Sequence, residues 1–201
     1  MTVTGLLLAA GAGTRMGGPK ALLTRADGSR YVDFALSALA EGGADEIVVV
    51  VGAEADAVRA HLSGYTGPAS LPGEAVQVVV ADQWATGMGS SLRAGLQAVQ
   101  SRPATCVVVA LVDLPDVTGA VVARVLRAAG EGGSALARAA YHGVPGHPVV
   151  LGRDHWAGVL AAAVGDRGAR DYLARHAPAL VECADLATGR DTDTPTDLAL
   201  G

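Results

Sequence analysis

A glycine-rich stretch near the start of the chain combines bare backbone with two fixed positive charges. In the segment LLLAAGAGTRMGGPKALL, residues 6–23, an apolar run gives way to Gly11, Gly13, Arg15 and Lys20. Peptide N–H groups at glycines can approach a phosphate or a base edge closely, because no side chain intervenes. Arginine and lysine add the charges that phosphates attract. The stretch therefore predicts a loop that lies open over a nucleotide, with an ordinary turn after a strand as the alternative.

Two other phosphate-binding patterns fit this stretch poorly. A P-loop ends in Gly-Lys-Ser/Thr, but Pro19 precedes Lys20 here and Ala21 follows it. The dinucleotide fingerprint G-x-G-x-x-G has Met16 in place of its third glycine. The proline that follows also interrupts the helix that this fingerprint should open. Neither pattern explains the stretch.

Three acids are candidate metal ligands beside this loop. Asp113 ends the apolar run TCVVVALVDLP, residues 105–115, and Asp191 and Asp193 stand in the segment DTDTPTDLAL, residues 191–200. Mg²⁺ uses few protein carboxylates together with phosphate oxygens and water. We expect Asp113 to bind Mg²⁺, and Asp191 and Asp193 to complete its shell, with no choice between the last two. A helix cap is the alternative role for these acids.

The composition argues against several classes of function. A net charge of -5 offers no basic face for a nucleic-acid groove. Cys106 and Cys183 form no C-x-x-C pair, which argues against zinc and favours a reducing compartment. No apolar stretch approaches the ~20 residues that cross a bilayer, and no basic region precedes the first apolar run, as a secretory signal would require. We therefore expect a cytoplasmic protein without membrane partners.

Buried strands and helices alternate along the first two thirds of the chain. Continuous apolar runs and helical spacing predict strands at 3–10, 46–53, 75–81 and 105–115 and helices at 31–41, 54–62, 89–102 and 117–129, the third helix with a serine cap. This alternation indicates a parallel sheet covered by helices on both faces. Ligands of such sheets gather at the carboxyl ends of the strands. The glycine-rich stretch and Asp113 both belong to that edge.

The last third of the chain predicts a small mixed-strand extension. Two strands around a Gly-Pro turn are expected within residues 134–151, and a helix entered through a Gly-Asp turn at 165–176. A strand at 180–186 and a capped terminal helix at 191–200 follow. With no linker or repeat, we expect one domain over residues 1–201, its nucleotide-binding half ending at about residue 130 and its acceptor-side half following. The predicted fold class is a three-layer α/β/α arrangement around a mostly parallel sheet.

The segment L-A-A-G-x-G-T-R-M-G-G-x-K at residues 8–20 resembles the signature of the MobA-like nucleotidyltransferases, which share the GT-A type α/β fold. In detail it is most similar to molybdenum cofactor cytidylyltransferases of the MocA type. Five more segments resemble that family's motifs in the same order: DQWATGMGSSLRAGL at 82–96, LVDLP at 111–115, GVPGHPVVL at 143–151, GDRGARDYL at 165–173 and DTDTPTDL at 191–198. Asp82 stands where relatives often have asparagine. The resemblance covers nearly the whole chain.

The resemblance implies a Mg²⁺-dependent reaction in which a phosphate of molybdenum-molybdopterin attacks CTP, CMP is transferred and pyrophosphate leaves. Both reactants are anions, so charge screening and positioning would supply much of the catalysis. The implied catalytic residues are Lys20, Arg15 and Asp113. The implied nucleotide-binding residues are Leu8, Ala9, Ala10, Gly11, Gly13, Thr14, Arg15, Lys20, Gly87, Ser90 and Ser91.

Some implied roles leave alternatives open. Ser91 either caps a helix or, like Ser90, contacts the cytosine, and Trp84 either stacks on the base or covers the core. In the family, Leu-Ala-Ala-Gly goes with cytidylyl transfer and Leu-Ala-Gly-Gly with guanylyl transfer. Ala10 would narrow the space beside a base, which favours CTP. The residues implied to face the acceptor are His147, Asp166 and Arg170.

Three other functions are compatible with parts of this pattern. A guanylyltransferase, or a transferase for another phosphorylated acceptor, would use the same loop. An NAD(P)H-dependent oxidoreductase is a further alternative, since one branch similar to MocA is described as oxidoreductases. It would need an acid on the cofactor's ribose, and Glu54 alone stands near the expected place. A non-catalytic nucleotide-binding chaperone for a molybdoenzyme is the third alternative. It would not need Asp113, so the presence of this acid favours an enzyme. A molybdoenzyme would then receive the enzyme's product.

Overall fold

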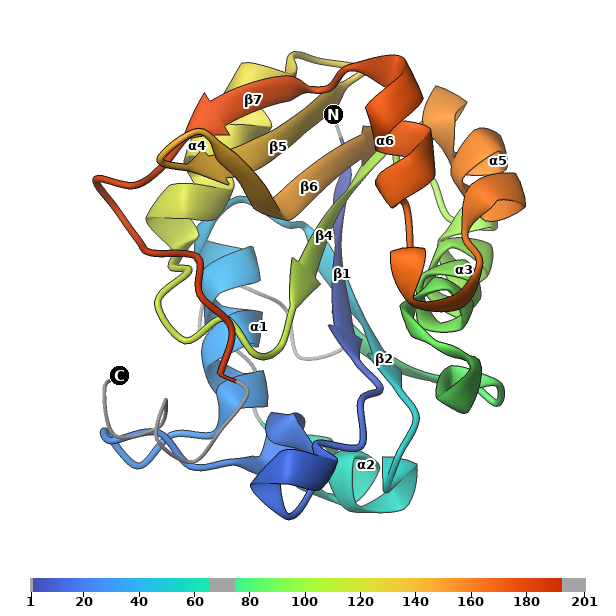
Figure 1. The fold of residues 1–201 in the computed structure, drawn as a ribbon. Coiled ribbons are helices and arrows are strands. Elements are labelled where there is room, and N and C mark those ends of the chain that lie inside the picture. The colour runs from blue at the N-terminus through green and yellow to red at the C-terminus, as the bar shows by residue number, and fades with distance from the viewer. Residues whose placement is uncertain (1, 66–74, 193–201) are drawn as a thin grey trace.

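A seven-stranded sheet runs through the protein and carries helices on both faces (Figure 1). The computed structural model describes residues 2–65 and 75–192. The strands are β1 Val3–Ala9, β2 Glu46–Val51, β3 Val76–Val80, β4 Cys106–Leu111, β5 Leu136–Tyr141, β6 Val144–Gly152 and β7 Ala179–Glu182. The helices are α1 Tyr31–Glu41, α2 Ala55–Ser63, α3 Met88–Gln100, α4 Gly119–Ala129, α5 Arg153–Ala162 and α6 Arg170–His176. Single 3₁₀ turns are η1 Thr14–Met16, η2 Lys20–Leu22, η3 Trp84–Thr86 and η4 Gly165–Arg167.

The sheet is parallel in its first part and mixed in its second. Its strands lie in the order β3-β2-β1-β4-β6-β5-β7. β1 pairs in parallel with both β2 and β4, and β2 pairs in parallel with β3. β6 runs antiparallel to β4 and β5, and β7 joins β5 in parallel. The predicted three-layer α/β/α class, with a mostly parallel sheet and a mixed-strand extension, is confirmed.

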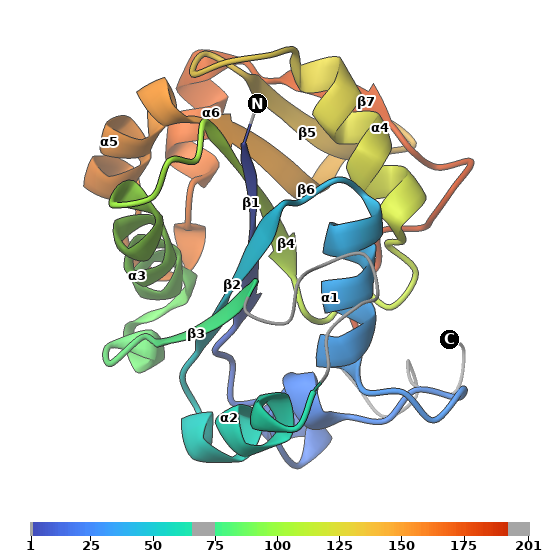
Figure 2. The same ribbon diagram turned by 180° about the vertical axis from the view of Figure 1, so that it is seen from behind.

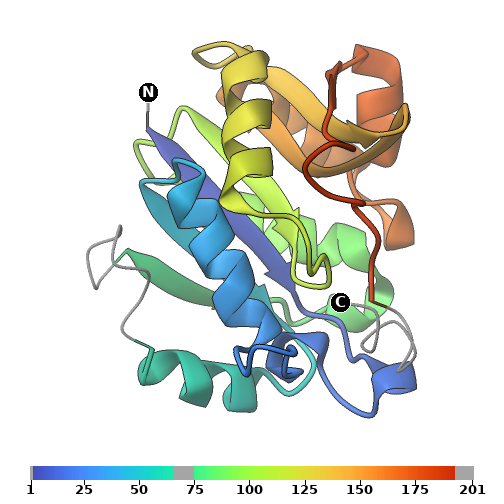
Figure 3. The same cartoon turned by 90° about the vertical axis from the view of Figure 1, so that its left-hand side faces the viewer.

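Alternating side chains of the central strand enter two separate cores. On β1, Leu7 packs into the core that α1 and α4 cover, whereas Leu6 and Leu8 pack into the core that α3, α5 and α6 cover. Figures 2 and 3 show α1 and α4 side by side on one face of the sheet. Complete burial of a leucine side chain contributes about 1.5–3 kcal/mol. A shift of β1 by one residue would exchange its two faces, so these leucines fix the register of the strands that carry the loops.

The helices predicted in the first two thirds agree with α1 to α4 within two residues at each end. The serine cap predicted for α3 is wrong, because the helix begins at Met88 after Gly87 and has no side-chain cap. Gly87 adopts φ 117°, and a Cβ there would lie 2.4 Å from the carbonyl carbon of Gly165. A glycine is therefore required where α3 meets η4.

The C-terminal third differs from prediction in three details. The hairpin between β5 and β6 turns at His142 and Gly143, both with positive φ, rather than at a Gly-Pro turn. Pro145 instead lies within β6, opposite Ala140. The sequence pattern missed α5, because a helix that buries little beyond Trp156 and Val159 shows too few apolar positions for a clear period. The strand expected at 180–186 ends at Glu182, and the predicted terminal helix falls, except for its first two residues, outside the described residues.

Candidate functional site

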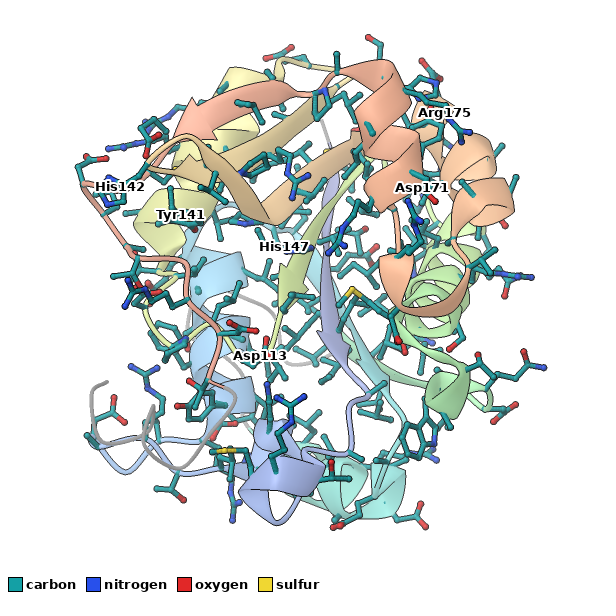
Figure 4. The ribbon with its side chains drawn as sticks, viewed as in Figure 1. Asp113, Tyr141, His142, His147, Asp171 and Arg175 are labelled. Carbon is teal, nitrogen blue, oxygen red and sulfur yellow. The ribbon has the colours of Figure 1, made fainter. Side chains whose placement is uncertain are left out.

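Lys20 and Asp113 meet at the carboxyl edge of the sheet. Leu8 of β1 lies opposite Leu111 of β4, so the loops that follow these adjacent strands emerge side by side. The Lys20 Nζ lies 2.8 Å from Asp113 Oδ2, and both side chains are largely buried. Figure 4 shows Asp113 just beyond the tip of β4, on the side of the glycine-rich loop. The sequence contains no other lysine. The edge thus combines a cation and a carboxylate that come from opposite ends of the predicted nucleotide-binding half.

The glycine-rich loop folds back on Gly13. This residue adopts φ +56°, and its carbonyl accepts hydrogen bonds from the N–H groups of Met16 and Gly18 at 2.7 and 3.4 Å. A Cβ at Gly13 would lie 2.0 Å from the Gly18 carbonyl oxygen, so the fold of the loop requires glycine here. Gly11 is exposed and has open space where a Cβ would stand. Its backbone is therefore accessible to a ligand.

A cavity of about 310 Å³, the loop cavity, opens between this loop and the start of α3. Its volume lies at the small end of the range for ligand sites. Lys20 and Asp113 form one wall, and Trp84 and Met88 form another. Residues of the predicted nucleotide site that line it are Leu8, Ala10, Gly11, Gly13, Lys20, Gly87 and Ser91.

Four residues predicted to bind the nucleotide do not line the loop cavity. Ala9 points into the core on the opposite face of the sheet. Thr14 and Arg15 are exposed on η1. The Ser90 hydroxyl lies 2.7 and 2.8 Å from the carbonyl oxygens of Gln83 and Gly87 and donates its single proton to one or the other. Ser91, in contrast, is buried at the cavity wall and lies inside α3, so it does not act as the helix cap.

A second cavity of about 330 Å³, the arginine cavity, adjoins the first. Leu8, Met88, Leu111 and Asp166 line both cavities, so the two share a wall. The structure brings together here the residues predicted to face an acceptor, namely His147, Asp166 and Arg170, with Asp191. Two further arginines that the sequence did not single out, Arg138 and Arg167, also line it. Arg138 lies in an apolar strand segment without a motif, and no signal in a single sequence would have selected it.

Positive charge dominates the electrostatics around His147. Burial, reinforced by the charges of Arg138 and Arg170, lowers the pKa of His147 from 6.5 to about 4. Burial and the neighbouring Arg170 also lower the pKa of Arg138. His147 is therefore neutral at neutral pH, and the fixed positive charge of this wall belongs to the arginines.

A returning segment of the chain brings Asp191 towards Asp113. The N–H of Thr192 donates to the Asp113 carbonyl oxygen at 2.9 Å, and the Thr192 hydroxyl lies 3.2 Å from that of Tyr31. Within residues 2–65 and 75–192, no group of three or more His, Cys, Asp or Glu side chains could hold a metal ion. Two carboxylates with phosphate oxygens and water are nevertheless a donor set of the kind that Mg²⁺ prefers. Asp193 lies outside the described residues.

Comparison with known proteins identifies the family. Residues 5–180 match the model of the MobA-like NTP transferase domain. The chain belongs to this family. Its enzymes bind nucleoside triphosphates and phosphorylated acceptors, and several use divalent metals, so the match supports an enzyme with nucleotidyltransferase chemistry. No helix in the described part of the chain is long and apolar enough to cross a membrane.

Three similar proteins define the relation further. Nicotine blue oxidoreductase of Paenarthrobacter nicotinovorans is 40% identical over 205 residues, which cover 96% of this chain and 92% of the relative. A nucleotidyl transferase from Methanothermobacter has the same fold, with a TM-score of 0.79 at 23% identity over 99% of this chain and 95% of its own. A Mycobacterium tuberculosis protein in complex with manganese gives a TM-score of 0.71 at 29% identity, over 100% of this chain and 97% of its own.

Proposed function

We propose that this protein is a Mg²⁺-dependent nucleotidyltransferase that transfers CMP from CTP to molybdenum-molybdopterin and releases pyrophosphate. The Lys20–Asp113 pair at the wall of the loop cavity is the observation that carries the proposal. The adjoining arginine cavity suits an anionic acceptor, and a shared wall would bring the two reactants together. Membership of the NTP transferase family supports the reaction class.

The chain's own residues would act by binding the reactants and neutralising their charge. Backbone N–H groups at Gly11 and Gly13 would approach the triphosphate, since no side chain blocks them. Lys20 would share its ammonium between Asp113 and the phosphates, and would stabilise charge on the departing pyrophosphate. Arg15 would add a second positive charge from η1. The acceptor phosphate is already a nucleophile, so no general base is required of the protein.

Two carboxylates would hold the magnesium ion. Asp113 and Asp191 supply hard oxygen donors, and Asp193 is a third candidate by sequence. When bound, Mg²⁺ would supply positive charge against the phosphates, and the role of Asp113 and Asp191 would be to hold it beside the loop cavity. The manganese complex of the M. tuberculosis relative supports a divalent-metal site in proteins of this fold.

Two residues at the loop cavity support CTP as the nucleotide. Ala10 is 5% exposed and lines the cavity, where its methyl group would narrow the space beside a base. Ser91 offers a buried hydroxyl on the same wall for contacts with a base edge. The preference for CTP rests on these positions and on the Leu-Ala-Ala-Gly segment.

The relative from P. nicotinovorans is an oxidoreductase by name, which supports oxidoreductase activity as a second function. NAD(P)H would be the cofactor of that activity. Such a protein would need an acid on the cofactor's ribose. Glu54, the candidate by sequence, is exposed before α2 and lines neither of the two cavities. This geometry favours the nucleotidyltransferase.

Thermal unfolding with each of the four ribonucleoside triphosphates, with and without Mg²⁺, tests the proposal. A ligand at about 100 times its Kd should raise the Tm by about 5–10 °C for a chain of this size. We expect the largest rise with CTP and Mg²⁺, followed by pyrophosphate release when molybdenum-molybdopterin is added. Equal release from GTP would overturn the nucleotide assignment. NADPH binding by calorimetry, with no response to any triphosphate, would establish the oxidoreductase instead.

A further inference from the structure

Arg138 projects from β5, the strand next to one edge of the sheet, into the arginine cavity. It lies on β5, opposite Val149 of β6 and Leu180 of β7. Its neighbours Ala137 and Ala139 are fully buried in the core on the other face of the sheet. Arg138 therefore points to the face that carries α3 and α6, where it lines the cavity with His147 and Arg170. A half-buried arginine in an apolar strand pattern calls for a specific partner, because desolvation of an unpaired charge is costly.

A bulge in β6 fixes the orientation of this arginine. The strand register shifts between the pair Arg138–Val149 and the pair Ala140–Pro145, which leaves Gly146 and the two residues after it outside the regular pairing. Arg138 Nε and Nη2 donate to the Gly146 carbonyl oxygen at 3.3 and 3.1 Å. The Tyr141 hydroxyl donates to the His147 carbonyl oxygen at 2.7 Å. Bulges re-aim side chains at sites, and here one holds His147 and the guanidinium of Arg138 on the same wall.

Arg138 and Arg170 form no ion pair with a carboxylate of the described residues. Arg167 pairs with Asp171 on α6. Asp166 and Asp191 also line the cavity, but neither forms an ion pair with these guanidinium groups. The cavity therefore presents two arginines that repel one another around a neutral histidine, which is the arrangement that an anion would stabilise.

We propose that Arg138 and Arg170 together bind a phosphate monoester dianion, and that Arg138 selects the phosphorylated acceptor of the transfer reaction. The assignment of this anion as the acceptor rests on the proposed function. Arg138 would offer its remaining N–H groups to phosphate oxygens, because arginine matches phosphate geometry with two parallel hydrogen bonds. Leu92, Val149 and Leu173 line the same cavity and would contact the organic part of the acceptor.

Inorganic phosphate, without nucleotide or metal, is the probe for this site. The proton resonances of His147, identified by their loss in His147→Gln, report an anion at this wall. Near neutral pH, where the phosphate dianion is present, bound phosphate should shift them saturably, because the anion would lie beside the imidazole in the same cavity. Acetate at the same concentrations distinguishes a phosphate site from a site for any anion. An equal response to acetate would overturn the assignment of a phosphate dianion.

Matched variants separate a binding role from a structural one. Arg138→Gln and Arg170→Gln should each weaken phosphate binding about tenfold or more, since each removes charged hydrogen bonds. Arg138→Lys keeps the positive charge but loses the planar guanidinium group that can donate two parallel hydrogen bonds. It should therefore show an intermediate loss of phosphate affinity. Arg175→Gln removes the same charge from an exposed position on α6 (labelled in Figure 4) and should change nothing. Unchanged phosphate affinity in folded Arg138→Gln would overturn the proposal.

The same measurements, combined with the pyrophosphate assay, distinguish a failure of the anion site from a failure of the proposed transferase function. Lys20→Ala, which alters the loop cavity, should retain the phosphate response at His147. One outcome is that no triphosphate yields pyrophosphate, while phosphate still shifts the His147 resonances and Arg138→Gln still weakens that response. This outcome would support the anion site and contradict the transferase reaction. The opposite outcome is that CTP yields pyrophosphate, while Arg138→Gln changes neither phosphate binding nor the KM for the acceptor. This outcome would support the transferase reaction and contradict the anion site.

Discussion

The ammonium of Lys20 lies 2.8 Å from the carboxylate of Asp113, although 93 positions separate them along the chain. The sheet order explains the contact, because β1 and β4 are adjacent and their following loops share one edge. A cation and an anion in direct contact can each exchange partners when a metal and a triphosphate bind. The pair therefore holds both groups in position and limits the reorganisation that binding would require.

Replacement of Asp113 by asparagine should abolish most of the transferase activity while the fold persists. Asparagine keeps the shape of the side chain but removes the charge that a magnesium ligand needs. Loss of one preorganised charge in such a site lowers kcat by about 100-fold or more. Pyrophosphate release from CTP at several Mg²⁺ concentrations measures the effect. Asp185→Asn, which removes an exposed acid paired with Arg124, serves as control and should keep full activity.

Acylation of amino groups should inactivate the enzyme through one side chain. Lys20 is the sole lysine in the sequence, so amine reagents can modify this residue and the chain's terminal amine alone. An acylated lysine loses the charge that would neutralise the triphosphate. We expect CTP with Mg²⁺ to protect Lys20, as measured by peptide mass spectrometry alongside activity. A Lys20→Arg variant is the control, and equal inactivation of that variant would show that the terminal amine is responsible.

Much of the framework follows from the sequence, because buried parallel strands leave long apolar runs and helices leave a clear period. These signals predict β1 to β4 and α1 to α4, and hence the edge at which Lys20 and Asp113 meet. Arg138 escapes prediction because its role depends on a bulge in another strand and on a helix more than 30 residues away. Ser90 illustrates the opposite limit. It stands in a segment that resembles a family motif, yet its hydroxyl group is hydrogen-bonded to the backbone carbonyl oxygens of nearby residues.

Two alanine substitutions in the glycine-rich loop should separate folding from ligand binding. Gly13→Ala places a Cβ 2.0 Å from the Gly18 carbonyl oxygen at a left-handed backbone position. It should lower the free energy of unfolding by at least about 1–2 kcal/mol, the cost of that backbone conformation for a residue with a side chain. Gly11→Ala meets no atom within 4 Å and should leave stability unchanged.

Gly11→Ala should instead weaken nucleotide binding. A methyl group at Gly11 would stand on the accessible backbone of the loop cavity and hinder the approach of phosphate or base. We therefore expect Gly11→Ala to reduce the Tm rise with CTP and Mg²⁺ while the Tm of the free protein stays the same. Urea unfolding and thermal unfolding, each with and without nucleotide, provide both measurements. A full CTP response in Gly11→Ala would contradict a ligand-contacting role for this backbone.

The pKa of His147 predicts how the stability of the protein depends on pH. In the unfolded chain the imidazole gains its proton as pH falls through about 6.5, whereas in the folded protein it stays neutral until about pH 4. The unfolded state therefore binds more protons over this interval, and the free energy of unfolding falls as pH falls from about 6.5 to about 4. With a pKa lowered by burial and by Arg138 and Arg170, the loss can reach at most about 3 kcal/mol.

Urea unfolding at several pH values between about 7 and 4 measures this loss. His147→Gln cannot take up the proton in either state, so its free energy of unfolding should fall less steeply over the same interval. His142→Gln removes an exposed histidine from the turn between β5 and β6 and should retain the slope of the unsubstituted protein. Equal slopes for His147→Gln and the unsubstituted protein would show that burial and the charges of Arg138 and Arg170 do not hold the imidazole neutral.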